Sequence, residues 1–127
     1  MARLILDRGA VIGFTRGNPD VAAAIRIAVQ RGDELVVPPV VVAETVRGGH
    51  GDAPVNRLLN AVRVTFAGLR IGRMAGWLLG AAGMSNAADA MVMAEAVRGG
   101  SCVLLTSDVH DMTRLAAGRS SVTIVGV

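Results

Sequence analysis

Apolar residues occur along this chain either in short unbroken runs or at helical spacing, and the two patterns alternate. The unbroken runs predict buried strands at 3–6, 34–37, 64–66, 102–106 and 122–127. The segments with helical spacing predict helices at 19–31, 39–47, 55–62, 69–82, 87–98 and 109–117. Strands that alternate with helices are typical of a parallel sheet with helices on both faces. The pattern therefore predicts an α/β fold.

Turn-forming and helix-capping residues support these boundaries. Asn18 followed by Pro19 is typical of a helix start, because Asn caps the first turn and Pro fits the first helical position. Pro39 opens a later helix in the same way. The glycine-rich segment 47–54 predicts the one flexible loop. No repeat or linker interrupts the 127 residues, so we expect a single domain over 1–127.

Four acidic residues stand beside apolar segments that are expected to form the core. Asp7 and Asp108 each follow a predicted buried strand. Glu44 ends the apolar run 40–44, and Asp89 lies in the first turn of an Ala-rich helix. The chain has only ten acidic residues, and an ionised carboxylate rarely stays buried unless it is paired or binds a metal. The four acids are therefore candidate metal ligands.

Each of these acids also has a purely structural interpretation. Asp7 fits the start of a turn after its strand, and Asp108 fits the cap of the helix that follows it. Glu44 fits an ion pair with Arg47, one helical turn further on. Asp89 fits a favourable interaction with its helix N-terminus. Taken together these interpretations would make the placement of all four acids a coincidence, so we favour one shared site.

A divalent cation is the cofactor that such a site would take. Active sites of open parallel sheets lie at the carboxyl ends of the strands, where Asp7 and Asp108 are expected. Mg²⁺ and Mn²⁺ prefer oxygen ligands, and the chain has no competing Cys/His cluster. Two such ions about 3.5–4 Å apart can activate a water and stabilise the leaving oxygen of a phosphodiester. The sequence therefore predicts Mg²⁺, with Mn²⁺ as a substitute.

Other catalytic schemes lack the residues that they need. All thirteen basic residues are Arg, so a phosphate-binding loop that ends in Lys is excluded, and so is a response-regulator receiver. His50 and His110 do not have zinc-binding spacing, and no Gly-x-Ser-x-Gly motif occurs. The net charge of +3 weakly favours a polyanionic partner.

The same composition bears on the cellular compartment. Cys102 is the only cysteine and cannot form an internal disulfide, which favours a reducing environment. No apolar stretch approaches the ~20 residues that a membrane span needs. The unbroken apolar run before Asp7 has only three residues, Leu4 to Leu6, too few for the core of a signal peptide. We therefore expect a cytoplasmic protein that has no contact with a membrane.

The order of these motifs resembles the PIN domain. The pattern consists of Asp7 after a first strand, Glu44 in an early helix, the pair Asp89-Ala90 opening a helix, and Thr106-Ser107-Asp108 after a later strand. Length, order and compactness are most similar to the VapC-type toxins of bacterial toxin–antitoxin pairs. The resemblance covers essentially the whole chain, and the motifs are specific through their joint order and spacing. It implies a three-layer PIN-like domain with a central, mostly parallel sheet flanked by helices.

The resemblance also implies an activity and its partners. A protein of this family would be a Mg²⁺-dependent endoribonuclease that cleaves RNA with a metal-activated water, forms a homodimer and is held inactive by a cognate antitoxin. The family's catalytic acids map onto Asp7, Glu44, Asp89 and Asp108. Its hydroxyl residue before the last acid maps onto Thr106, and Asp111 takes the place of a further supporting acid. Arg8 departs from the small or hydroxyl residue of relatives and is a candidate for binding substrate phosphate.

Two other functions stay open at this point. The chain could be a PIN nuclease used in RNA processing or DNA repair, or a PIN-like scaffold that binds RNA or protein without cleaving. Retention of all four acids disfavours the scaffold. The expected homodimer rests on the resemblance and on aliphatic residues of the helices 19–31 and 55–62, which exceed what one small core needs.

Overall fold

A five-stranded parallel sheet forms the centre of the protein in the computed structural model, which describes residues 2–127. The strand order is β3-β2-β1-β4-β5, and every neighbouring pair is parallel. The strands are β1 (Arg3–Leu6), β2 (Glu34–Val37), β3 (Arg63–Val64), β4 (Cys102–Thr106) and β5 (Val122–Gly126). The two central strands, β1 and β4, are paired from Arg3–Cys102 to Leu6–Leu105, so their carboxyl ends lie side by side.

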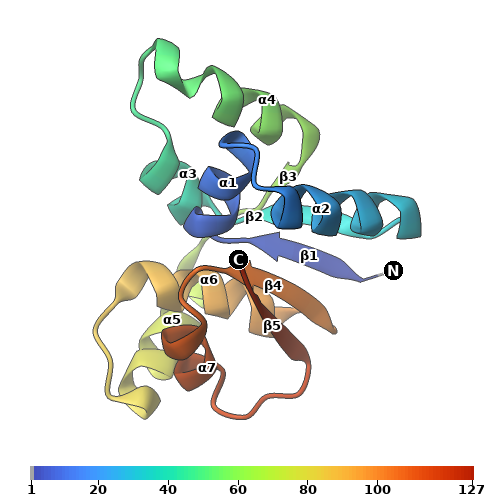
Figure 1. Cartoon of the computed structure of the whole chain (residues 1–127). Coiled ribbons are helices and arrows are strands. Elements are labelled where there is room, and N and C mark those ends of the chain that lie inside the picture. The colour runs from blue at the N-terminus through green and yellow to red at the C-terminus, as the bar shows by residue number, and fades with distance from the viewer. Residues whose placement is uncertain (1) are drawn as a thin grey trace.

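Helices cover both faces of this sheet (Figure 1). One group consists of α1 (Arg8–Thr15), α2 (Pro19–Arg31), α3 (Pro39–Thr45), the short 3₁₀ helix η1 (His50–Asp52) and α4 (Ala53–Ala61). The other group consists of α5 (Leu69–Ala82), α6 (Ala87–Arg98) and α7 (Val109–Ala116). Figure 1 shows the two groups on opposite sides of β1 and β2. The predicted three-layer α/β fold is confirmed.

The core between these layers is aliphatic. Ile5 and Leu6 of β1 and Leu104 and Leu105 of β4 are at most 1% exposed, because both faces of the central strands are covered. Met93 of α6 is fully buried as well. Within residues 2–127, no helix is long and apolar enough to span a membrane.

The structure corrects the sequence prediction at α1, which was not predicted. The helix begins directly after Asp7, whose carboxylate accepts the N–H of Ala10 at 3.0 Å. Two glycines, Gly9 and Gly13, interrupt the helical pattern in the sequence, and a strand followed by Asp-Arg-Gly is typical of a turn. The turn predicted at Asp7 is therefore an N-cap.

Two further boundaries differ from the prediction. Helix α3 ends at Thr45 instead of 47, because the N–H groups of Arg47 and Gly48 donate to the carboxylate of Asp52 and not to helical carbonyls. Strand β3 covers only Arg63–Val64 instead of 64–66. Its pairing partner β2 ends at Val37, so the ladder cannot continue.

Candidate metal and catalytic site

The four acids that the sequence singled out border one small pocket at the carboxyl ends of β1 and β4. The pocket has a volume of about 90 Å³. Its lining consists of Asp7, Arg8, Gly9, Glu44, Asn86, Asp89, Val92, Ser107 and Asp108. These residues come from the ends of two strands and from helices of both layers, so the fold brings together segments about a hundred positions apart in the sequence.

Asp7 is fixed between β1 and α1. Its backbone N–H donates to Leu105 of β4 at 3.1 Å, and its side chain caps α1. Burial raises the pKa of the Asp7 carboxyl, whereas hydrogen bonds from the Thr106 hydroxyl and the Ala10 N–H partly lower it. The nearby charge of Asp108 raises this pKa again. Ionisation of the Asp7 carboxyl in the folded protein therefore costs free energy.

Among the pocket acids, Asp89 has the largest shift in pKa. It is 9% exposed in the first turn of α6, where Asn86 accepts its N–H and donates from Nδ2 to its Oδ2, both at 3.1 Å. Burial is the main cause that raises the pKa of Asp89 to about 6, and the charges of Asp108 and Asp7 add to it. The surrounding negative charge thus works against ionisation of this carboxyl.

Glu44 lies half-buried at the last turn of α3. Burial raises its pKa, Arg8 lowers it, and the charge of Asp7 raises it further. Arg47 donates from Nη2 to the backbone oxygen of Glu44 at 2.9 Å and does not form an ion pair with its carboxylate. The structural alternative of a Glu44–Arg47 ion pair is therefore wrong.

Asp108 is exposed at the start of α7. Its side chain makes no capping hydrogen bond, so the interpretation of this carboxylate as a helix cap is wrong. Its backbone N–H donates instead to the Thr106 hydroxyl at 2.8 Å. Thr106 is fully buried, and its hydroxyl also acts to lower the pKa of the Asp7 carboxyl.

The two remaining candidates lie close to this group. Asp111 is half-buried in the first turn of α7 and does not line the pocket, but its charge raises the pKa of Asp89. Arg8 is exposed and lines the pocket. Its guanidinium forms no ion pair within residues 2–127, and its charge lowers the pKa of Glu44.

Sequence reasoning missed Gly9 and Ser107 as parts of the site. A Cβ on Gly9 would collide with the side chain of Ser107, so the glycine allows α1 to approach the end of β4. The N–H of Ser107 is one of the groups that lower the pKa of Asp7. The role of Gly9 depends on α1, a helix for which the sequence contains no clear signal.

The donor set fits a hard divalent cation. The ion pairs of the described chain join arginines to Glu34 and Glu95, and none involves a pocket acid. Four carboxylates therefore surround one pocket with oxygen donors only, which is the ligand chemistry of Mg²⁺ and Mn²⁺. As placed, no three Asp, Glu, His or Cys side chains of residues 2–127 form a group that could hold an ion, so a bound cation would need these carboxylates to move closer together.

Comparisons with known proteins identify relatives by structure but not by sequence. No family model matches the chain. No curated protein matches it either. A chain of VapBC2 from Rickettsia felis, solved bound to a promoter DNA fragment, superposes with a TM-score of 0.76 at 12% identity and 98% coverage of both chains. A chain of DNA-bound VapBC from Salmonella typhimurium gives 0.74 at 15% identity, with coverage of 99% of this chain and 98% of that one.

A third similar structure is a chain of VapBC-1 from nontypeable Haemophilus influenzae. It has a TM-score of 0.70 and 20% identity, and covers 98% of this chain and 97% of that chain. At the level of fold, the resemblance to VapC-type PIN domains is confirmed by these three superpositions over nearly the full length. At such low identities the superpositions define a fold and do not transfer an activity.

Proposed function

We propose that this protein is a Mg²⁺-dependent endoribonuclease and the toxin of a type II toxin–antitoxin pair. The observation that carries the proposal is the pocket itself, because four carboxylates without an ion-pair partner converge there at the carboxyl ends of β1 and β4. Repulsion among these four carboxylates destabilises the fold unless a bound cation neutralises their charge. The similarity to chains of VapBC structures supports the choice of a toxin.

Each residue at the acidic pocket has a proposed role that follows from its position. Asp7, Glu44, Asp89 and Asp108 would hold the cation, Mg²⁺ or Mn²⁺. When bound, such an ion supplies positive charge that neutralises the carboxylates, polarises a phosphate and favours ionisation of water. The Thr106 hydroxyl orients Asp7, and Asn86 orients Asp89. Arg8, which lines the pocket, would bind the substrate phosphate next to the scissile bond.

An RNA cleavage assay with two matched variants tests this proposal. Asp89→Asn keeps the side-chain size and removes the charge, whereas Asp20→Asn makes the same change in the first turn of α2, away from the pocket. We expect Mg²⁺-dependent cleavage by wild type and Asp20→Asn, and loss of cleavage by EDTA and in Asp89→Asn. Full activity of Asp89→Asn would overturn the catalytic assignment.

The antitoxin is a proposed partner, and the structure offers a matching groove. A pocket of about 480 Å³ between α1, α2 and α4 is lined mainly by apolar residues, among them Phe14, Ile25 and Leu58. An apolar helix of an antitoxin would fit this groove while a basic side chain reaches the acidic pocket. Coexpression with a small neighbouring gene tests it; if no complex forms and growth is not restored, the RNA-processing or DNA-repair alternative is favoured.

The homodimer is likewise a proposal. Ile27 and Val29 of α2 are 45% and 60% exposed, as expected from the sequence, but larger apolar side chains lie exposed on and before α5, namely Phe66, Leu69 and Trp77. Surfaces of this kind are often covered by a second copy. Light scattering should give a dimer mass at tens of micromolar, and a monomer mass would contradict the proposal.

A further inference from the structure

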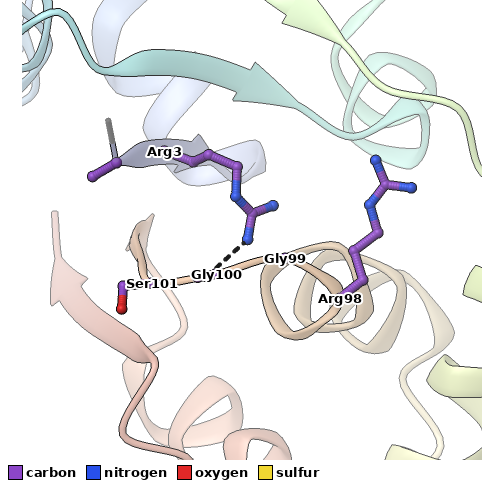
Figure 2. A pocket seen from close by; sticks show the side chains of 6 residues that line it. Arg3, Arg98, Gly99, Gly100 and Ser101 are labelled. Carbon is purple, nitrogen blue, oxygen red and sulfur yellow. Dashed lines mark hydrogen bonds between the residues drawn. The ribbon is translucent and has the colours of Figure 1, made fainter.

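A second polar region lies at the opposite end of the sheet, where β1 and β4 begin. Two adjoining pockets open there, with volumes of about 540 and 570 Å³, and they share Arg98 and Gly99. We call them together the basic furrow. Its polar lining consists of Arg3, Arg98 and the backbone of 99–101 in one pocket, which Figure 2 shows, and of Arg70 in the other.

Arg3 forms one wall of the furrow, and hydrogen bonds hold its side chain in place. Its guanidinium donates to the carbonyl oxygens of Glu95, Ala96 and Gly100 at 3.0–3.2 Å, and so closes the carboxyl end of α6. Figure 2 shows the guanidinium lying against the loop backbone. A Cβ on Gly99 would come within 2.5 Å of the Arg3 Cζ, so the glycine permits this approach. Arg3 itself is therefore a structural cation whose donors are already used.

Arg98 is oriented differently and keeps free donors. Its Nε lies 3.1 Å from Glu95 Oε1, and the Glu95 side chain is only 3% exposed, so a fixed buried carboxylate holds one edge of the guanidinium. The two terminal nitrogens of Arg98 have no acceptor among residues 2–127, and the side chain is 44% exposed. A guanidinium that is bound at Nε can still form a bidentate contact with an anion through its two terminal nitrogens.

Backbone donors line the pocket that Arg98 also borders. The N–H groups of Gly99, Gly100 and Ser101 donate to no acceptor in the described part of the chain, and all three residues are exposed. The Ser101 hydroxyl is a further donor at the pocket lining. Free backbone N–H groups and an arginine that border one pocket can each donate to a phosphate bound there.

Charge favours an anion as well. The lining of the two pockets contains three arginines, Arg3, Arg70 and Arg98, and no carboxylate. Glu95 forms ion pairs with Arg3 and Arg98, and Asp33 accepts the N–H of Ala2. The adjoining pocket adds an apolar wall of Ile71, Met74 and Val97, which suits the organic part of a ligand. The acidic pocket at the other end of the sheet has the opposite sign.

From this arrangement we propose that the basic furrow binds the phosphate of a nucleotide unit. Arg98 and Arg70 provide the charge, the amides of 99–101 provide the backbone donors, and the apolar wall of α5 and α6 accepts the attached group. The phosphate can belong to a free nucleotide or to a nucleic acid strand. The site is separate from the acidic pocket and does not depend on the nuclease proposal.

Amide NMR spectra of the folded protein in EDTA test this site directly. Titration with pyrophosphate should shift the amide resonances of Gly99, Gly100 and Ser101 in a saturable way. Arg98→Gln should weaken this binding at least ~10-fold, the loss of one charge-assisted contact. Arg73→Gln, which removes the same charge from an exposed position of α5 outside the furrow, should leave it unchanged.

A second variant keeps the test decisive if Arg98→Gln fails to fold. Arg70→Gln removes an exposed guanidinium that makes no hydrogen bond within residues 2–127, and it should also weaken pyrophosphate binding. The site does not exist if pyrophosphate produces no saturable shift in wild type, or if the folded furrow variants bind as tightly as Arg73→Gln.

Two further ligands distinguish the source of the phosphate. AMP and a short single-stranded RNA are titrated in the same way, and the amides near Asp7 report the acidic pocket separately. Tighter binding of the RNA at 99–101 assigns the furrow to a nucleic acid strand, whereas equal or weaker RNA binding assigns it to a free nucleotide.

Discussion

At the two ends of the sheet, the neighbours of a buried carboxylate differ in the sign of their charge. At the amino ends of the strands, Glu95 is buried and burial raises its pKa, but Arg98, Arg3 and Arg63 all act to lower it. At the carboxyl ends, Asp89 is buried to a similar degree, and every neighbouring charge that affects its pKa raises it further. Burial costs both residues free energy, and only Glu95 has arginine partners in the chain that offset the cost, because Asp89 has a hydrogen bond from Asn86 but no ion pair.

This difference separates a structural carboxylate from a functional one. The Glu95 network joins β1 to the carboxyl end of α6, so its interactions are complete within the fold. The acidic pocket is incomplete, because none of its four acids forms an ion pair among the described residues and the charge of Arg8 acts mainly on Glu44. Burial and a raised pKa alone would have selected both sites; the sign of the neighbouring charges tells them apart.

The largest predicted effect is on cleavage by variants of the acidic pocket. Asp7→Asn and Asp89→Asn should each lower RNA cleavage more than ~100-fold, because even residues that only support a metal site typically contribute ~10–100-fold. The double variant should be less than ~10-fold worse than either single one, since the residues act as one unit. Glu95→Gln is the control from the other end of the sheet and should retain activity. Independent, multiplying effects of the two Asp variants would contradict a shared site.

The next effect concerns stability at the opposite end of the sheet. Arg3→Met removes three hydrogen bonds to α6 carbonyls and one partner of buried Glu95. We expect a loss of about 2–4 kcal/mol in the free energy of unfolding, slightly below the usual range for a broken buried pair because Arg98 remains. Urea unfolding measures it, with Arg73→Met as an exposed control that should stay within about 0.5 kcal/mol of wild type. If Arg3→Met is no less stable than that control, the network is not structural.

A smaller effect is the pH dependence caused by Asp89. Its pKa is about 6 in the folded protein against 3.8 as the reference value, so protonation stabilises the fold. This contribution is fully present below about 3.8 and is lost as the pH rises through 6. Without divalent cations, Asp89→Asn should therefore be more stable than wild type at pH 7 by about 1–2 kcal/mol, less than the full shift implies because the pocket borders solvent.

Unfolding at pH 5 and pH 7 checks this prediction. The difference in free energy of unfolding between Asp89→Asn and wild type should be smaller at pH 5, where Asp89 of the wild type is largely protonated. Asp20→Asn is the matched control and should show no such change. An advantage that is equal at both pH values would mean that Asp89 does not titrate between them.

Much of the fold could be predicted from the sequence, and the reasons are local. Helix α5 (Leu69–Ala82) matches its prediction, because its apolar spacing is regular and Gly83 follows it with φ of +64°. Strand β4 matches for a similar reason, as an unbroken buried run. Helix α1 was missed because its apolar pattern is short and contains two glycines. The end of α3 was missed because it depends on Asp52, a hydrogen-bond partner outside the helix.

The candidate site was predictable as a set of residues but not as an arrangement. Positions at two strand ends, in one first helical turn and in one otherwise apolar helix were enough to select the four acids. Their common pocket depends on parallel pairing of β1 and β4 and on the close approach of α1 at Gly9, which are long-range features. The furrow at Arg98 was not predicted, since its exposed arginine at the end of a helix is indistinguishable in sequence from a solvated one.

Binding of Mn²⁺ to the folded protein tests the central contrast most directly. Titration calorimetry of wild type, Asp89→Asn and Glu95→Gln should show saturable binding to wild type and to Glu95→Gln, and binding weakened at least ~10-fold in Asp89→Asn, which has lost a charged ligand. Equal binding by Asp89→Asn and wild type, or no saturable binding by wild type, would contradict the claim that the unpaired carboxylates form a cation site.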